Sequence, residues 1–213
     1  MPNLKDLKNR IESVKSTRKI TKAMQMVAAA KLRKAQEAAE QARPYAEKMS
    51  VVIERLASST NASSNSPLLI GNGKHKTHLI IVATSERGLC GAFNSSIVRL
   101  AKNHINQLLS DGNQIKILTI GKKGREQLKR DFGDYMIHHV DLSEVKTISY
   151  DNASDICDNI ILKFLEDEFD IATIFYNQFE SVLSQTPQAS QLIPIEVKSD
   201  EFTGDTNISN FVY

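Results

Sequence analysis

The sequence has little cysteine: Cys90 and Cys157 are its two cysteines, which are too few for a disulfide framework. Neither lies in a CxxC motif, so a reducing compartment fits best. No apolar run approaches the roughly 18 residues that a transmembrane helix needs. The first residues also lack the apolar core of a signal peptide. These absences predict a soluble chain.

Acidic residues are scarce at the N-terminal end. Residues 1–34 contain ten Lys and Arg against Asp6 and Glu12, which gives this segment a net charge of +8. Because the whole chain carries +2, the remaining residues carry −6. Aromatic side chains that could stack on bases are absent from residues 1–44. The imbalance therefore favours a charged protein partner over nucleic acid.

The N-terminal segment shows the heptad spacing of a coiled coil. Apolar residues recur at steps of three and four from Leu4 through Val14. The same count continues to Leu56, so about 54 residues would form a rod roughly 80 Å long at ~1.5 Å per residue. Pro44 should kink it. Residues 57–213 contain no second long heptad segment, so the partner helix must come from outside this sequence.

The stretch ITKAMQMVAAAKLRKA (20–35) departs from a plain coiled coil. Polar side chains interrupt the seam at Arg18, Thr21 and Gln25. Apolar side chains lie off the seam at Ile20, Met24 and Val27. A solvated coiled-coil face does not explain apolar side chains that are spread around the helix.

The rest of the chain reads as an α/β protein, with a small doubly wound, Rossmann-like domain after the coiled-coil helix. We expect the coiled-coil helix at 1–58, a flexible Ser/Asn-rich linker at 59–76 and the α/β domain at 77–213. Strands are predicted at 77–85, 115–121, 136–140, 171–179 and, as an edge strand, 191–197. Helices are predicted near 93–108, up to Gly133, and near 156–165.

No motif predicts a catalytic, cofactor or metal site. SERGLCGAFNSS (85–96) carries GxxG, which falls short of the dinucleotide and P-loop patterns and is more typical of a tight strand-to-helix turn. Cys90 has no obvious His or Asn partner. The five histidines, His75, His78, His104, His138 and His139, give no complete ligand set, because adjacent strand residues face opposite ways.

Taken in order, these motifs resemble the gamma subunit of F-type ATP synthases. The resemblance rests on ITKAMQMVAAAKLRKA, ARPYAEKM, SERGLCGAFN, YNQFESVLSQTPQ and SQLIP, collinear over the whole chain. Glu86 stands where the family more often has Asp. Family members continue past NFVY (210–213) into a C-terminal helix that pairs antiparallel with the N-terminal one, so the chain is expected to be a fragment or a truncated product.

The resemblance implies a non-catalytic rotor stalk inside a ring of alpha and beta subunits. Its asymmetric contacts would bias each catalytic site in turn, coupling proton flow to synthesis of ATP from ADP and phosphate. The expected coupling contacts are Lys19, Lys22, Met24, Met26, Arg33 and Lys34. The α/β domain would form the foot of the stalk, with Arg87, Gly88 and Gly91 in a turn on its docking face.

The implied partners are the alpha and beta subunits, the epsilon (or delta) subunit, the membrane ring of c subunits and the stalk's own C-terminal helix. The implied location is peripheral, on the cytoplasmic face of a bacterial inner membrane, with the matrix side of a mitochondrial membrane as second choice. Two other classes remain open from the residues alone. A Rossmann-like enzyme with a coiled-coil arm would bind nucleotide at Gly88–Gly91, and a basic adaptor would bind duplex with steep salt dependence.

Overall fold

A single helix makes up the N-terminal unit of the chain. The computed structural model describes residues 3–59 and 66–195, and the chain divides into two units, Met1–Arg55 and Leu56–Tyr213. Helix α1 (Leu4–Ser59) is 56 residues long and remains helical through Pro44. Asn3 begins it by accepting the backbone N–H of Lys5 at its Oδ1, at 3.3 Å.

The apolar seam residues of α1 lie in solvent. Leu4 is 69% exposed, Ile11 53% and Val14 67%, although these are the positions that a coiled coil buries. Among the described residues of this unit, 3–55, no second element covers them. A helix of this kind gains its stability from packing, so α1 presents a surface that is built for a partner.

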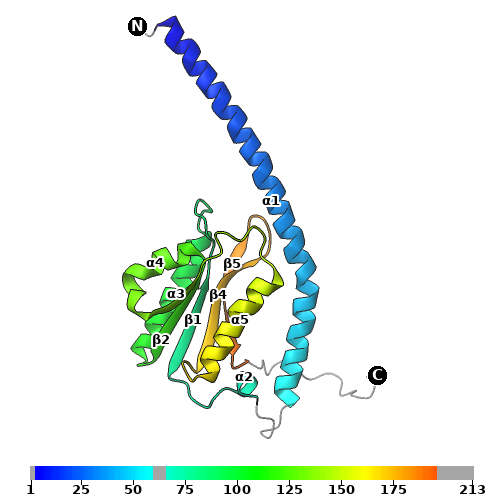
Figure 1. The fold of residues 1–213 in the computed structure, drawn as a ribbon, viewed down its shortest axis with the longest axis vertical. Coiled ribbons are helices and arrows are strands. Elements are labelled where there is room, and N and C mark those ends of the chain that lie inside the picture. The colour runs from blue at the N-terminus through cyan, green and yellow to red at the C-terminus, as the bar shows by residue number, and fades with distance from the viewer. Residues whose placement is uncertain (1–2, 60–65, 196–213) are drawn as a thin grey trace, which may run out of the picture. The chain divides into compact units, whose positions relative to one another are not determined.

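The second unit is a five-stranded sheet with helices on both faces (Figure 1). The strand order is β3-β2-β1-β4-β5. The strands are β1 (Thr77–Ala83), β2 (Gln114–Ile120), β3 (Met136–Val140), β4 (Ile171–Phe179) and β5 (Gln185–Ile193). The first four are parallel, and β5 is antiparallel to β4. The sheet confirms the doubly wound α/β fold that the sequence predicts.

Three helices cover this sheet. Helices α3 (Phe93–Ser110) and α4 (Lys122–Phe132) pack on one face, and α5 (Tyr150–Leu165) packs on the other. A short 3-10 turn, η1 (Gly133–Tyr135), joins α4 to β3. The strand residues alternate between the two layers, so Ile80 and Val82 face α3 while Leu79 and Ile81 face α5.

The structure corrects three boundaries in this unit. The edge strand runs over Gln185–Ile193 rather than 191–197, because Pro194 has no N–H to donate and the strand ends before it. Residues 196–197 of that expectation lie outside the described residues. Helix α5 begins six residues before Ile156, because Ser149 and Asn152 form a capping box.

The predicted linker at 59–76 contains ordered structure. Residues 60–65 lie outside the described part of the chain, but α2 (Pro67–Ile70) is a short helix with Pro at its first turn. Leu68 of α2 packs against the buried cluster beneath α5. Leu68 is only partly buried and Ile70 is 54% exposed, so α2 lies at the margin of the core of the α/β unit.

Asp170 ties the residues before β1 to the start of β4. Its Oδ2 accepts the backbone N–H groups of Lys76 and Thr77, both at 2.9 Å, and its Oδ1 accepts Asn72 Nδ2 at 2.8 Å. Burial raises the pKa of this carboxyl, but the hydrogen bonds from Asn72, Thr77 and Lys76 outweigh burial and leave the pKa below its ordinary value. The carboxylate is 5% exposed.

We expect Asp170→Asn to lower the free energy of unfolding by about 2 kcal/mol or more at neutral pH, because the charge that strengthens these hydrogen bonds is lost and the new amide nitrogen would face Asn72 Nδ2. A carboxyl whose pKa is lowered by folding stabilises the protein above its unfolded pKa, near 3.9, and loses that effect as the pH falls through its folded value. Urea unfolding should therefore show a gap between wild type and variant that shrinks below about pH 4. Asp158→Asn, on the exposed face of α5, is the matched control; an equal effect there would contradict the assignment.

Candidate functional site

The structure places all six expected coupling residues on α1, and each is exposed. Met24 and Met26 are both 67% exposed, which is unusual for large apolar side chains in a protein without partners. Arg33 donates to Glu37 one turn later, with Nε and Oε1 2.8 Å apart. Exposed pairs of this kind contribute little to stability, so Arg33 remains available to a partner.

The six residues do not share one face of the helix. At roughly 100° per residue, Met26 lies on the side opposite the heptad seam and Met24 lies beside the seam. Basic side chains accompany Met26: Lys19, Lys22 and Arg33 fall within roughly a third of the circumference, and Lys34 borders them. Met24 instead continues an apolar stripe with Ile20 and Val27. The helix therefore has three distinct surfaces: a seam, an apolar flank and a basic back.

The turn between β1 and α3 is held by its own polar side chains. Asn94 accepts the backbone N–H of Ser85 at 3.0 Å and donates through Nδ2 to Ser85 Oγ at 2.9 Å and to Cys90 Sγ at 3.2 Å. Ser85 Oγ also donates to the carbonyl of Arg87 at 2.5 Å. These bonds hold the segment between β1 and α3 in a defined strand-to-helix turn.

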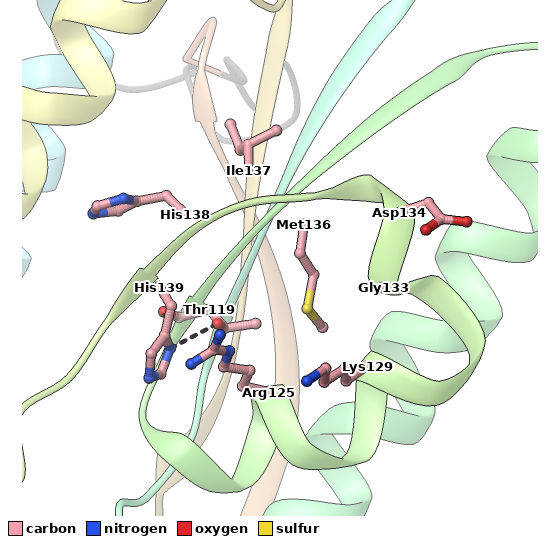
Figure 2. A pocket seen from close by; sticks show the side chains of 9 residues that line it. All are labelled: Thr119, Arg125, Lys129, Gly133, Asp134, Met136, Ile137, His138 and His139. Carbon is pink, nitrogen blue, oxygen red and sulfur yellow. Dashed lines mark hydrogen bonds between the residues drawn. The ribbon is translucent and has the colours of Figure 1, made fainter.

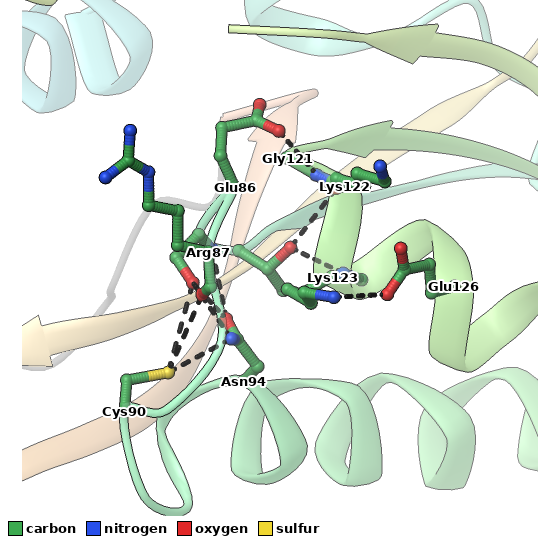
Figure 3. Close-up of polar contacts among 11 residues, drawn as sticks. Glu86, Arg87, Cys90, Asn94, Gly121, Lys122, Lys123 and Glu126 are labelled. Carbon is green, nitrogen blue, oxygen red and sulfur yellow. Dashed lines mark hydrogen bonds and ion pairs between the residues drawn. The ribbon is translucent and has the colours of Figure 1, made fainter. Parts of the chain in front are cut away.

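Glu86 joins this turn to two neighbouring loops. Its Oε2 accepts the backbone N–H of Lys122 at 3.0 Å, at the start of α4 (Figure 3). Its Oε1 accepts the backbone N–H of Leu142 at 2.8 Å, after β3. Both carboxylate oxygens are thus occupied by backbone donors. The sequence marks Glu86 only as a departure from the family pattern, and nothing in its spacing indicates this role.

The β1 and β2 ends approach too closely for a side chain at Gly121. This residue has φ +87°, and a Cβ there would lie 2.2 Å from the carbonyl oxygen of Thr84. Thr84 Oγ1 also accepts the N–H of Gly124 at 2.7 Å, in the first turn of α4. These contacts fix the end of β1, from which the turn to α3 starts, against the start of α4.

The tip of the turn projects into solvent. Leu89 is fully exposed at a φ of +62°, and Gly91 follows at φ +60°, in the left-handed region that favours glycine. Cys90 is exposed as well, and the guanidinium of Arg87 points away from the bonded cluster (Figure 3). Arg87, Gly88 and Gly91 lie together because they are neighbours in one continuous turn, and Leu89 is exposed at its tip.

The histidines do not assemble into a metal site. Within residues 3–59 and 66–195, no group of three or more His, Cys, Asp or Glu side chains could hold a metal ion. His104 packs against Phe175 with ring centroids 5.3 Å apart, and burial lowers its pKa.

The described helices also include none that is both long and apolar enough to span a bilayer.

An exposed long helix and a rigid turn with an apolar tip define a subunit of a larger assembly, and the comparisons with known proteins agree. A family model described as ATP synthase matches residues 3–212. The ATP synthase gamma chain of Jannaschia sp. is 63% identical over 208 residues, 97% of this chain and 70% of the relative. That of Paracoccus denitrificans is 61% identical over 202 residues, 94% of this chain and 70% of the relative.

A solved structure agrees with these relatives. The central stalk and c-ring of the Tetrahymena thermophila mitochondrial ATP synthase match at a TM-score of 0.61 and 28% identity, over 82% of this chain and 72% of that one. The chain belongs to the ATP synthase gamma-chain family. Membership contradicts the Rossmann-like enzyme alternative, because this family is a non-catalytic part of its complex.

We expect Glu86→Gln to destabilise the α/β unit by about 1–2 kcal/mol, because the amide keeps one acceptor and turns a donor toward the other backbone N–H. Glu86→Asp should fall between wild type and Glu86→Gln, since the shorter side chain cannot reach both loops. Urea unfolding measures the three free energies. Glu126→Gln, in a surface pair with Lys123, serves as the control. If it lowers the free energy of unfolding as much as Glu86→Gln, the two backbone hydrogen bonds of Glu86 do not explain the effect.

Proposed function

We propose that the chain is the central rotor stalk of a proton-translocating ATP synthase, with α1 as part of the shaft. The carrying observation is that α1 exposes a seam, an apolar flank and a basic back along one 56-residue helix. A shaft that turns within a ring meets different surfaces in turn, and it needs contacts on more than one side. Rotation then shifts each catalytic site between nucleotide affinities through differential contacts.

The partners of the three surfaces follow from their chemistry. The seam, from Leu4 to Val14 and beyond, suits a second helix of the stalk, which the family resemblance assigns to a C-terminal segment. The basic back, with Lys19, Lys22, Arg33 and Lys34, suits acidic or polar parts of the alpha and beta subunits. The apolar flank with Met24 suits an apolar sleeve of the same ring.

The α/β unit acts as the foot of the stalk in this proposal, next to the epsilon (or delta) subunit and the c-subunit ring. The complex would be peripheral to the cytoplasmic face of a bacterial inner membrane, which fits the bacterial origin of the similar gamma chains. The exposed tip at Leu89 and Cys90 is the docking surface that we assign to the unit.

We expect Met24→Lys to impair the coupling of ATP hydrolysis to proton pumping more than hydrolysis itself, because a new charge would enter the apolar flank. The two activities are measured side by side in inverted membrane vesicles that carry the complex. Met24→Leu, which keeps the flank apolar, should stay near wild type. An equal loss of pumping and hydrolysis in Met24→Lys would refute the coupling role.

Cross-linking from Cys90 identifies the partner of the turn. In the intact complex, Cys157→Ser leaves Cys90 as the chain's one thiol, and a thiol-to-amine cross-linker should capture a neighbouring subunit. We expect epsilon (or delta) or c. A product with alpha or beta would place the turn against the catalytic ring instead. Cys90→Ser is the control for adducts through Cys157.

A further inference from the structure

The free edge of the sheet carries a basic groove that the rotor proposal does not use. It lies between α4 and β3 and has a volume of about 540 Å³. Arg125 and Lys129, one turn apart on α4, line it together with Thr119, Met136 and His139 (Figure 2). Neither cation has an ion-pair partner among the described residues. Asp134 lies at the rim, and its carboxylate points away from the centre.

A β-bulge aims the side chains of β3 into this groove. Met136 pairs with Ile117 and His138 with Leu118, so Ile137 is an extra residue on β3. Strict alternation would place Met136 and His139 on opposite faces, but the extra residue brings both to the α4 side. His138 points to the other face, where it lines a smaller cavity beside α5. Bulges of this kind often accompany binding sites.

His139 is fixed in place by the neighbouring strand. Its Nδ1 lies 2.9 Å from Thr119 Oγ1 and 3.2 Å from the Thr119 carbonyl oxygen. These contacts engage Nδ1, and Nε2 is left for a ligand. The groove therefore offers two cations, one oriented imidazole and an apolar floor at Met136.

We infer that this groove binds an acidic, extended segment of a partner polypeptide, which continues the sheet beyond β3. β3 ends the sheet, so its outer backbone groups have no strand neighbour among residues 66–195. An added strand would use these groups, and its alternate side chains would reach Arg125 and Lys129. Charge complementarity selects glutamate or aspartate at those positions.

A small free anion fits the groove less well than a polypeptide. Phosphate sites are usually built from backbone N–H groups at a helix N-terminus, whereas Lys129 stands in the last turn of α4, where no such free N–H groups are available. The half-exposed Ile137 and the floor at Met136 also give apolar surface that an inorganic ion would not use. An extended chain uses the charges, the apolar surface and the strand edge together.

The test is a titration of the full chain with a labelled ten-residue peptide in which Glu alternates with Val or Thr, followed by fluorescence anisotropy. Replacing Glu by Gln in the peptide should weaken binding at least about tenfold, because the charge-assisted bonds are lost. The double variant Arg125→Ala/Lys129→Ala should weaken binding of the Glu peptide by a similar factor. The bound peptide should also slow amide exchange at residues 136–140.

The matched control removes the same charge from the same helix outside the groove. Lys122→Ala/Arg130→Ala should change affinity by less than about twofold, since neither residue lines the groove. Equal weakening in both double variants would reduce the effect to general charge attraction and overturn the inference. Three other results would also overturn the inference: the wild-type chain does not bind the peptide, amide exchange at residues 136–140 does not change, or inorganic phosphate binds the wild-type chain and displaces the peptide. Far-UV circular dichroism confirms that each variant is folded.

Discussion

Burial of β1 on both faces is the constraint on which the α/β unit depends. Leu79, Ile80, Ile81 and Val82 are all closed to solvent, so β1 needs a helical layer on each side and a strand at each edge. The strand order β3-β2-β1-β4-β5 satisfies this requirement with β1 at its centre. The turn after β1 then emerges at the point of the sheet where the order of connections reverses.

The sequence predicts the fold well wherever burial decides the outcome. Continuous apolar runs identify β1, β2 and β4, and helical spacing from Phe93 identifies α3. The errors occur where backbone bonding decides instead. The helix start at Ser149 depends on an Asn in its capping box, where Glu or Gln is the usual signal, and the edge strand stops at Pro194 although the apolar pattern continues.

The functional surfaces divide in the same way. The sequence predicts that Met24 and the basic back of α1 are exposed, because their positions lie outside the narrow apolar seam that one partner helix can cover. The role of Glu86 cannot be predicted from the sequence, because its two hydrogen-bond partners lie 36 and 56 positions away along the chain. The sequence does not predict the groove at β3 either, because strict alternation along a strand without a bulge would turn His139 away from Arg125.

The bulge at Ile137 also affects how readily the unassembled subunit associates with other copies of itself. A regular free edge would template the addition of further copies, and a protein that waits for its partners in solution is exposed to that hazard. An extra residue in the middle of a five-residue strand breaks the hydrogen-bond ladder after one pair, so two such edges cannot zip together along their length. A short partner segment can still pair with residues 138–140 beyond the bulge, so the irregularity disfavours pairing of two whole edges but leaves room for a brief added strand.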